Sequence, residues 1–63
     1  MTMKQEFEVI RKTVYYVAKR YYNYDRKEVA VKSAELLSSK GINVLNIPYL
    51  QDRWYECLDK YAA

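Results

Sequence analysis

The chain has 63 residues, of which 51% are hydrophobic and 30% are charged, with a formal net charge of +3. A chain of this length is expected to form a single domain over residues 1–63. The mixture of both charge signs with a large apolar fraction fits a folded domain and argues against a disordered chain. The small basic excess permits nucleic-acid binding but does not require it.

The residue types leave little room for catalysis or for bound cofactors. The sequence has no histidine, so neither a Ser-His-Asp nor a Cys-His arrangement can form. Its one glycine rules out a glycine-rich phosphate loop. Asp52, Glu56 and Asp59 share one side of a predicted helix, where a solvated surface is the simplest interpretation. We therefore expect a protein that is not an enzyme and that holds no cofactor and no metal.

Cys57 is the only cysteine, which excludes an internal disulfide and a cysteine-histidine metal cage. A lone thiol suits a reducing compartment. The first residues lack the apolar core of a signal peptide, and no apolar run approaches the roughly 20 residues that span a bilayer. We therefore expect a cytoplasmic protein without a membrane segment.

A helix is predicted over about residues 4–22, with residues 1–3 expected to be frayed. Apolar side chains recur at spacings of three and four residues, which places them on one stripe of a helix; they are Phe7, Ile10, Val14, Val17 and Tyr21. The β-forming segments VYYV and RYYNY leave a strand as the alternative. The helical spacing begins before the tyrosines and continues through them, which favours the helix.

A second helix is predicted over about residues 26–40. Asp25 followed by Glu28 has the spacing of a capping box, and Gly41 stands where a helix end favours a left-handed residue. If Gly41 ends the helix in a Schellman motif, Leu37 and Ile42 should contact each other. The apolar face is expected to contain Val29, Ala30, Ser33, Ala34, Leu36 and Leu37, whose small members allow close helix packing.

The third helix is predicted over about residues 47–61, after a short apolar connector of residues 42–47. Asn46 is a candidate cap, and Pro48 suits a first helical turn. The inward face is expected to contain Ile47, Leu50, Trp54, Cys57, Leu58 and Tyr61. Three helices with short connections and matching apolar stripes predict an all-α fold, a small three-helix bundle. A longer first helix that pairs with its copy is the alternative.

Several of the eight tyrosines fall outside the predicted stripes. Tyrosine and arginine are enriched at the energetic centres of protein interfaces, whereas tyrosines that only cover a small core are the simpler interpretation for any single ring. We expect the partner-binding surface to lie on the first helix and to consist of Arg11, Lys12, Tyr15, Tyr16, Lys19, Arg20 and Tyr22. The same interleaving of basic side chains and aromatic rings would also suit the binding of single-stranded nucleic acid.

These features predict a non-enzymatic regulator or inhibitor that binds another protein stoichiometrically. The small core and the surplus of apolar and aromatic residues also predict a homodimer. Such size and composition are typical of accessory proteins of phages and mobile elements.

The alternative function is a DNA-binding helix-turn-helix regulator that uses the second and third helices. The residues placed to contact bases would be Tyr49, Gln51 and Arg53. The acidic side chains that follow them on the third helix oppose phosphate binding, which dominates affinity for DNA.

Overall fold

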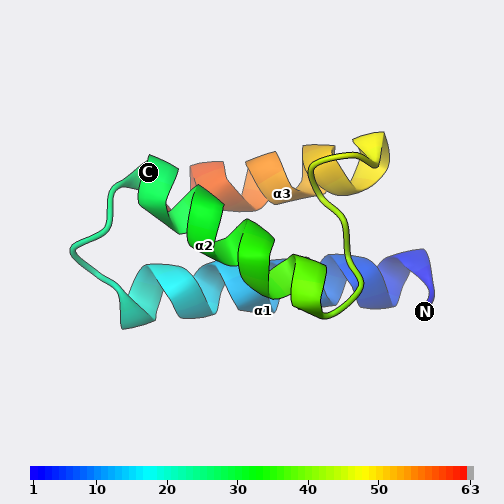
Figure 1. Ribbon diagram of the computed structural model, residues 1–63, viewed down its shortest axis with the longest axis horizontal. Helices are drawn as coiled ribbons and strands as arrows, with labels where there is room; N and C mark the ends of the chain where they lie inside the picture. The colour runs from blue at the N-terminus through cyan, green and yellow to red at the C-terminus, as the bar shows by residue number, and fades with distance from the viewer. Residues whose placement is uncertain (63) are drawn as a thin grey trace.

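The computed structural model describes residues 1–62, and these residues form three helices and no strand (Figure 1). They are α1 (Met3–Arg20), α2 (Arg26–Ser39) and α3 (Pro48–Tyr61). The α1 and α3 helices begin at the same end of the molecule and run in the same direction, whereas α2 runs in the opposite direction. The prediction of an all-α three-helix bundle is confirmed. None of these helices is both long enough and apolar enough to cross a bilayer.

The α1 helix begins earlier than predicted because Thr2 caps it. The Thr2 hydroxyl accepts a hydrogen bond from the Gln5 N–H at 3.2 Å, and the Gln5 side chain accepts one from the Thr2 N–H at 2.9 Å. This reciprocal pair is a capping box, which satisfies two backbone donors that would otherwise lack partners. The expectation that residues 1–3 are frayed is therefore wrong for Thr2 and Met3.

The α1 helix also ends two residues before the predicted boundary. Tyr21 leaves the helical conformation, and its carbonyl accepts a hydrogen bond from the Tyr24 N–H at 2.9 Å. The rings of Tyr21 and Tyr24 stack with centroids 4.8 Å apart, which stabilises this turn. Tyr22 lies within this turn, and its side chain is 88% exposed.

The ends of α2 form largely as the sequence indicates. The Asp25 carboxylate accepts a hydrogen bond from the Glu28 N–H at 2.9 Å. At the other end Gly41 has a φ of +81°, and the Ile42 N–H donates to the Leu37 carbonyl at 2.9 Å. Leu37 and Ile42 are both buried, so the predicted Schellman motif is confirmed.

The connector before α3 is a turn whose side chains point alternately inward and outward. Ile42 and Val44 are buried, whereas Leu45 is 59% exposed. Pro48 occupies the first turn of α3 as predicted, but Ile47 is the cap residue and makes no side-chain capping bond. The prediction that Asn46 caps this helix is wrong, because the helix begins one residue too late for it.

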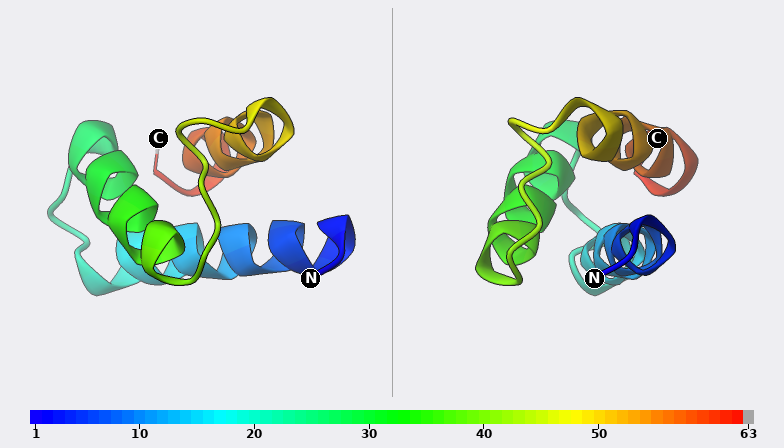
Figure 2. Two further views of the ribbon diagram at one scale, coloured as in Figure 1. Left: turned by 45° about the vertical axis from the view of Figure 1, so that its right-hand side comes forward. Right: turned by 90° about the vertical axis from the view of Figure 1, so that its right-hand side faces the viewer.

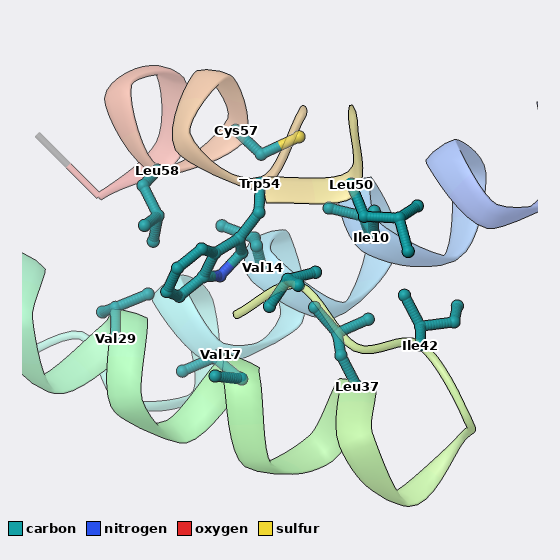
Figure 3. Packing of buried hydrophobic residues seen from close by; sticks show 12 residues of the cluster. Ile10, Val14, Val17, Val29, Leu37, Ile42, Leu50, Trp54, Cys57 and Leu58 are labelled. Carbon is teal, nitrogen blue, oxygen red and sulfur yellow. The ribbon is translucent and has the colours of Figure 1, made fainter. Parts of the chain in front are cut away.

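The hydrophobic core lies between the three helices, and both α2 and α3 pack mainly against α1 (Figures 2 and 3). The Trp54 ring extends from α3 into this core, close to α2. Its Nε1–H donates to the buried Ser33 hydroxyl at 3.0 Å. The buried apolar side chains are Ile10, Val14, Val17, Val29, Ala34, Leu37, Ile42, Val44, Leu50, Trp54, Cys57 and Leu58.

Replacing Gly41 by alanine is expected to destabilise the protein by about 1–2 kcal/mol, because an alanine strains the left-handed backbone that Gly41 adopts. Apart from Gly41 and its two chain neighbours, no residue has an atom within 4 Å of the added methyl group, so this cost comes from the backbone alone. Urea unfolding followed by circular dichroism measures it. Gly41→Asn should lose less, since asparagine tolerates this conformation; equal losses would argue against the backbone explanation.

Ser33→Ala is expected to cost about 1–3 kcal/mol, because it leaves the buried Trp54 N–H without an acceptor. Ser39→Ala is the matched control on the same helix, since the Ser39 hydroxyl bonds only the Leu36 carbonyl at an exposed position. The control should lose less than about 0.5 kcal/mol in the same urea experiment. Similar losses in both variants would contradict a special role for the indole bond.

Candidate functional site

The seven predicted partner-binding residues lie on the outer surface of α1 or directly after it. Arg11 is half-buried, and the other six are exposed. They do not form one continuous set, because some lie beside α3 and others beside α2. The surface of α1 therefore presents two neighbouring hollows with different surroundings.

The hollow between α1 and α3 gathers rings and ammonium groups. The rings of Tyr15 and Tyr61 meet edge to face with centroids 5.2 Å apart. The Lys19 ammonium lies 5.5 Å from the Tyr15 centroid, and the Lys60 ammonium lies 5.5 Å from the Tyr61 centroid. The volume of this hollow is about 350 Å³. We call the surface that lines it the tyrosine–lysine face; its residues are Tyr15, Lys19, Tyr22, Lys60 and Tyr61.

Arg11 extends this basic surface toward the middle of α3. It forms an ion pair with Glu8 one turn earlier in α1. The hydrogen bond from Arg11 holds the pKa of the Glu8 carboxyl below its ordinary value, and the same bond raises the pKa of Arg11. Arg11 also lines a small hollow with Arg53 and Lys60, so three cationic side chains converge beside Tyr61.

Lys12 and Tyr16 lie on the other side of α1, facing α2. They line a hollow of about 520 Å³ together with Leu36 and Lys40. The Lys40 ammonium donates a hydrogen bond to the buried Thr13 hydroxyl at 3.0 Å, which ties the end of α2 to α1. An internal contact between α1 and α2 thus forms part of the lining of this hollow.

Arg20 is the last of the predicted residues on α1. Its guanidinium carbon lies 6.0 Å from the centroid of the Tyr21 ring.

The predicted partner-binding surface does not include Lys60 and Tyr61, because the apolar stripe of α3 assigned Tyr61 to the core. In the structure Tyr61 lies at the edge of that stripe and is only half-buried. Its position in the last turn of α3 indicates partial exposure, because the apolar stripe of a helix ends there.

The three residues considered for DNA contact are each engaged within the chain. The Tyr49 hydroxyl donates to the Glu6 carboxylate at 2.8 Å, and this bond raises the pKa of Tyr49. The Gln51 side chain donates to the Leu45 carbonyl at 3.3 Å. Donation from the Tyr49 hydroxyl to a base would require the bond to Glu6 to break, whereas the Gln51 amide keeps a second N–H and its oxygen for other partners.

Arg53 is the most constrained of the three. Its guanidinium lies 5.4 Å from the Phe7 centroid on α1 and 3.6 Å from the Glu56 carboxylate. Its Nε is buried and has no hydrogen-bond partner among the described residues. The guanidinium thus packs against α1 as much as it faces solvent.

The acidic row on α3 is divided among different neighbours. Asp59 pairs with Arg26 at the start of α2, and Glu56 pairs with Arg53. In residues 1–62 no three histidine, cysteine, aspartate or glutamate side chains lie close enough to hold a metal ion. The solvated surface with ion pairs remains the interpretation of this row.

Cys57 is buried on the inward face of α3, where Figure 3 shows it beside Trp54. Burial raises the pKa of its thiol above the ordinary value of 9.0. A buried and protonated thiol is a poor nucleophile.

Comparisons of the chain with models of protein families, with curated proteins and with solved structures give no match.

The protein should lose stability at alkaline pH through Cys57. A raised folded-state pKa stabilises the protein fully below the ordinary thiol pKa, and this stabilisation is lost as pH rises through the folded value. Urea unfolding from about pH 7.5 to about pH 10.5 should therefore show a steeper decline in the wild type than in Cys57→Ala. Tyrosines ionise in both proteins, so the difference isolates the thiol. Parallel curves would refute the prediction.

Proposed function

We propose that this protein is a non-enzymatic binding module that regulates or inhibits another protein by stoichiometric association. The observation that carries this proposal is the tyrosine–lysine face. Two rings from different helices are already in contact there, and each ring has a lysine ammonium beside it. The lone buried thiol fits a reducing compartment such as the cytoplasm.

The contact between the rings of Tyr15 and Tyr61 orders part of this face before a partner arrives. Edge-to-face aromatic pairs contribute about 0.5–1.5 kcal/mol beyond their buried area. An ordered ring loses less conformational entropy on binding than a flexible side chain does, which favours affinity. Tyr22 is mostly exposed beside this pair and offers a further ring for contact.

The charges around the face indicate the chemistry of the partner. Lys19 and Lys60 border the rings, and Arg11 lies farther along the same side of α1. Two carboxylates of α1 and α3, Glu8 and Glu56, already pair with arginines of this chain. The best complement is a protein surface that places an apolar side chain on the rings and acidic side chains opposite the lysines.

Duplex DNA is a poorer fit to this chain. Tyr49 and Arg53, two of the three residues considered for base contact, already make contacts within the chain. The exposed side of α3 also carries Asp52 and Asp59, which oppose phosphate.

Immobilised protein should capture a protein partner from a cell lysate, and Tyr15→Ala or Tyr22→Ala should weaken the purified complex by about 2 kcal/mol or more. Titration calorimetry of the purified complex should give a stoichiometry near one partner per binding face. Tyr55→Ala is the matched control, because Tyr55 is 46% exposed on another side of α3 and Tyr15 is 44% exposed. The control should bind as the wild type does.

Two outcomes would contradict the proposal. One is an unchanged affinity in both tyrosine variants. The other is capture of nucleic acid alone, with affinity that falls steeply as salt rises.

A further inference from the structure

The outer side of α2 carries a row of three exposed side chains. Lys27, Val31 and Glu35 are four residues apart, so they form one ridge along the helix. Val31 is 54% exposed at the centre of this ridge. Within residues 1–62, Lys27 and Glu35 make no ion pair. The ridge thus has an apolar centre and opposite charges at its two ends.

A hollow lies on each side of this ridge. The first, of about 340 Å³, is lined on its far side by Tyr24, Glu28 and Lys32. The second, of about 530 Å³, is bordered by small or apolar side chains of α2, the connector and α3; they are Ala30, Ala34, Ser38, Leu45 and Trp54. A ridge flanked by grooves is the shape that packs against another helix.

We propose that this side of α2 binds a second copy of the chain, with the two α2 helices antiparallel about a twofold axis at Val31. The charge pattern is the reason for choosing this occupant. In such a pair, the residue four positions before Val31 meets the residue four positions after Val31 of the copy. Lys27 therefore faces the copy's Glu35 at one end, and Glu35 faces the copy's Lys27 at the other.

This arrangement is self-complementary, as a twofold interface must be. Each Val31 enters the space between Lys27, Ala30, Val31 and Ala34 of the copy, where the two alanines leave room. Leu45, exposed beside this space, would lose contact with water in the dimer. The partner is thus specified by shape, by apolar contact and by charge.

The proposed dimer contact uses no residue of the tyrosine–lysine face. It also differs from a dimer built on α1, since α2 and α3 of the same chain already cover the apolar stripe of that helix. A twofold dimer would present two copies of the proposed binding face. The inference stands independently of that face, because it concerns the purified chain alone.

Sedimentation equilibrium tests the proposal on the purified protein at concentrations from about 5 μM to about 500 μM, over which a weak dimer forms. The expected mass rises toward that of two chains as concentration increases. Val31→Asp should weaken the association at least about tenfold, because it places two carboxylates at the axis. Met3→Asp is the control; Met3 is 57% exposed on α1, and its replacement should change nothing.

Charge reversal tests the register. Lys27→Glu alone and Glu35→Lys alone should each weaken self-association, since like charges then face each other at both ends. An equimolar mixture of the two single variants should recover the dimer, and so should the double variant Lys27→Glu/Glu35→Lys. Circular dichroism verifies that every variant keeps its helices, as expected for exposed positions.

The proposal is overturned by a wild-type chain that stays monomeric over this range. It is also overturned by a dimer that Val31→Asp leaves intact, or by a mixture of reversed variants that does not associate. None of these results depends on a partner protein, so they are distinguishable from failure of the proposed binding function.

Discussion

Among residues 1–62, the hydrogen bond from the Trp54 indole to the Ser33 hydroxyl is the buried side-chain hydrogen bond that links two helices. It joins α3 to α2 inside the core, while both helices pack mainly against α1. A serine is small enough to let the large ring approach α2, and its oxygen satisfies the only polar atom of that ring. Ser33 also donates to the Ala30 carbonyl, so its hydroxyl both donates and accepts a hydrogen bond.

Both proposed surfaces follow from this packing. The ring of Trp54 lies under the small residues of α2, which leaves a hollow beside Val31 on the outside. The approach of α3 to α1 brings Tyr61 against Tyr15 at the far end. A chain of 63 residues has a small interior, so much of its apolar and aromatic side-chain area must remain near the surface. Association with other molecules would bury part of that area.

The helices were predictable because spacing and end signals are local. The stripe of Ile10, Val14 and Val17 and the glycine at position 41 needed no knowledge of the rest of the chain. Contacts between helices were not predictable, because they depend on how each helix is rotated. Single-helix patterns therefore could not place Tyr61 beside Tyr15 or Arg53 over Phe7. The pattern Thr-x-x-Gln at the start of the chain is that of a capping box, but the weak apolar pattern around it did not indicate that the helix begins there.

The common direction of α1 and α3 has an electrostatic consequence at the end where both helices finish. Each helix has a partial negative charge there, about half an elementary charge from its aligned peptide dipoles. Two such ends side by side repel each other unless cations lie near them. The last turns of these helices carry Lys19, Arg20 and Lys60. The lysines beside the paired tyrosines thus help to hold two parallel helices together, so the charge of that surface is tied to the fold itself.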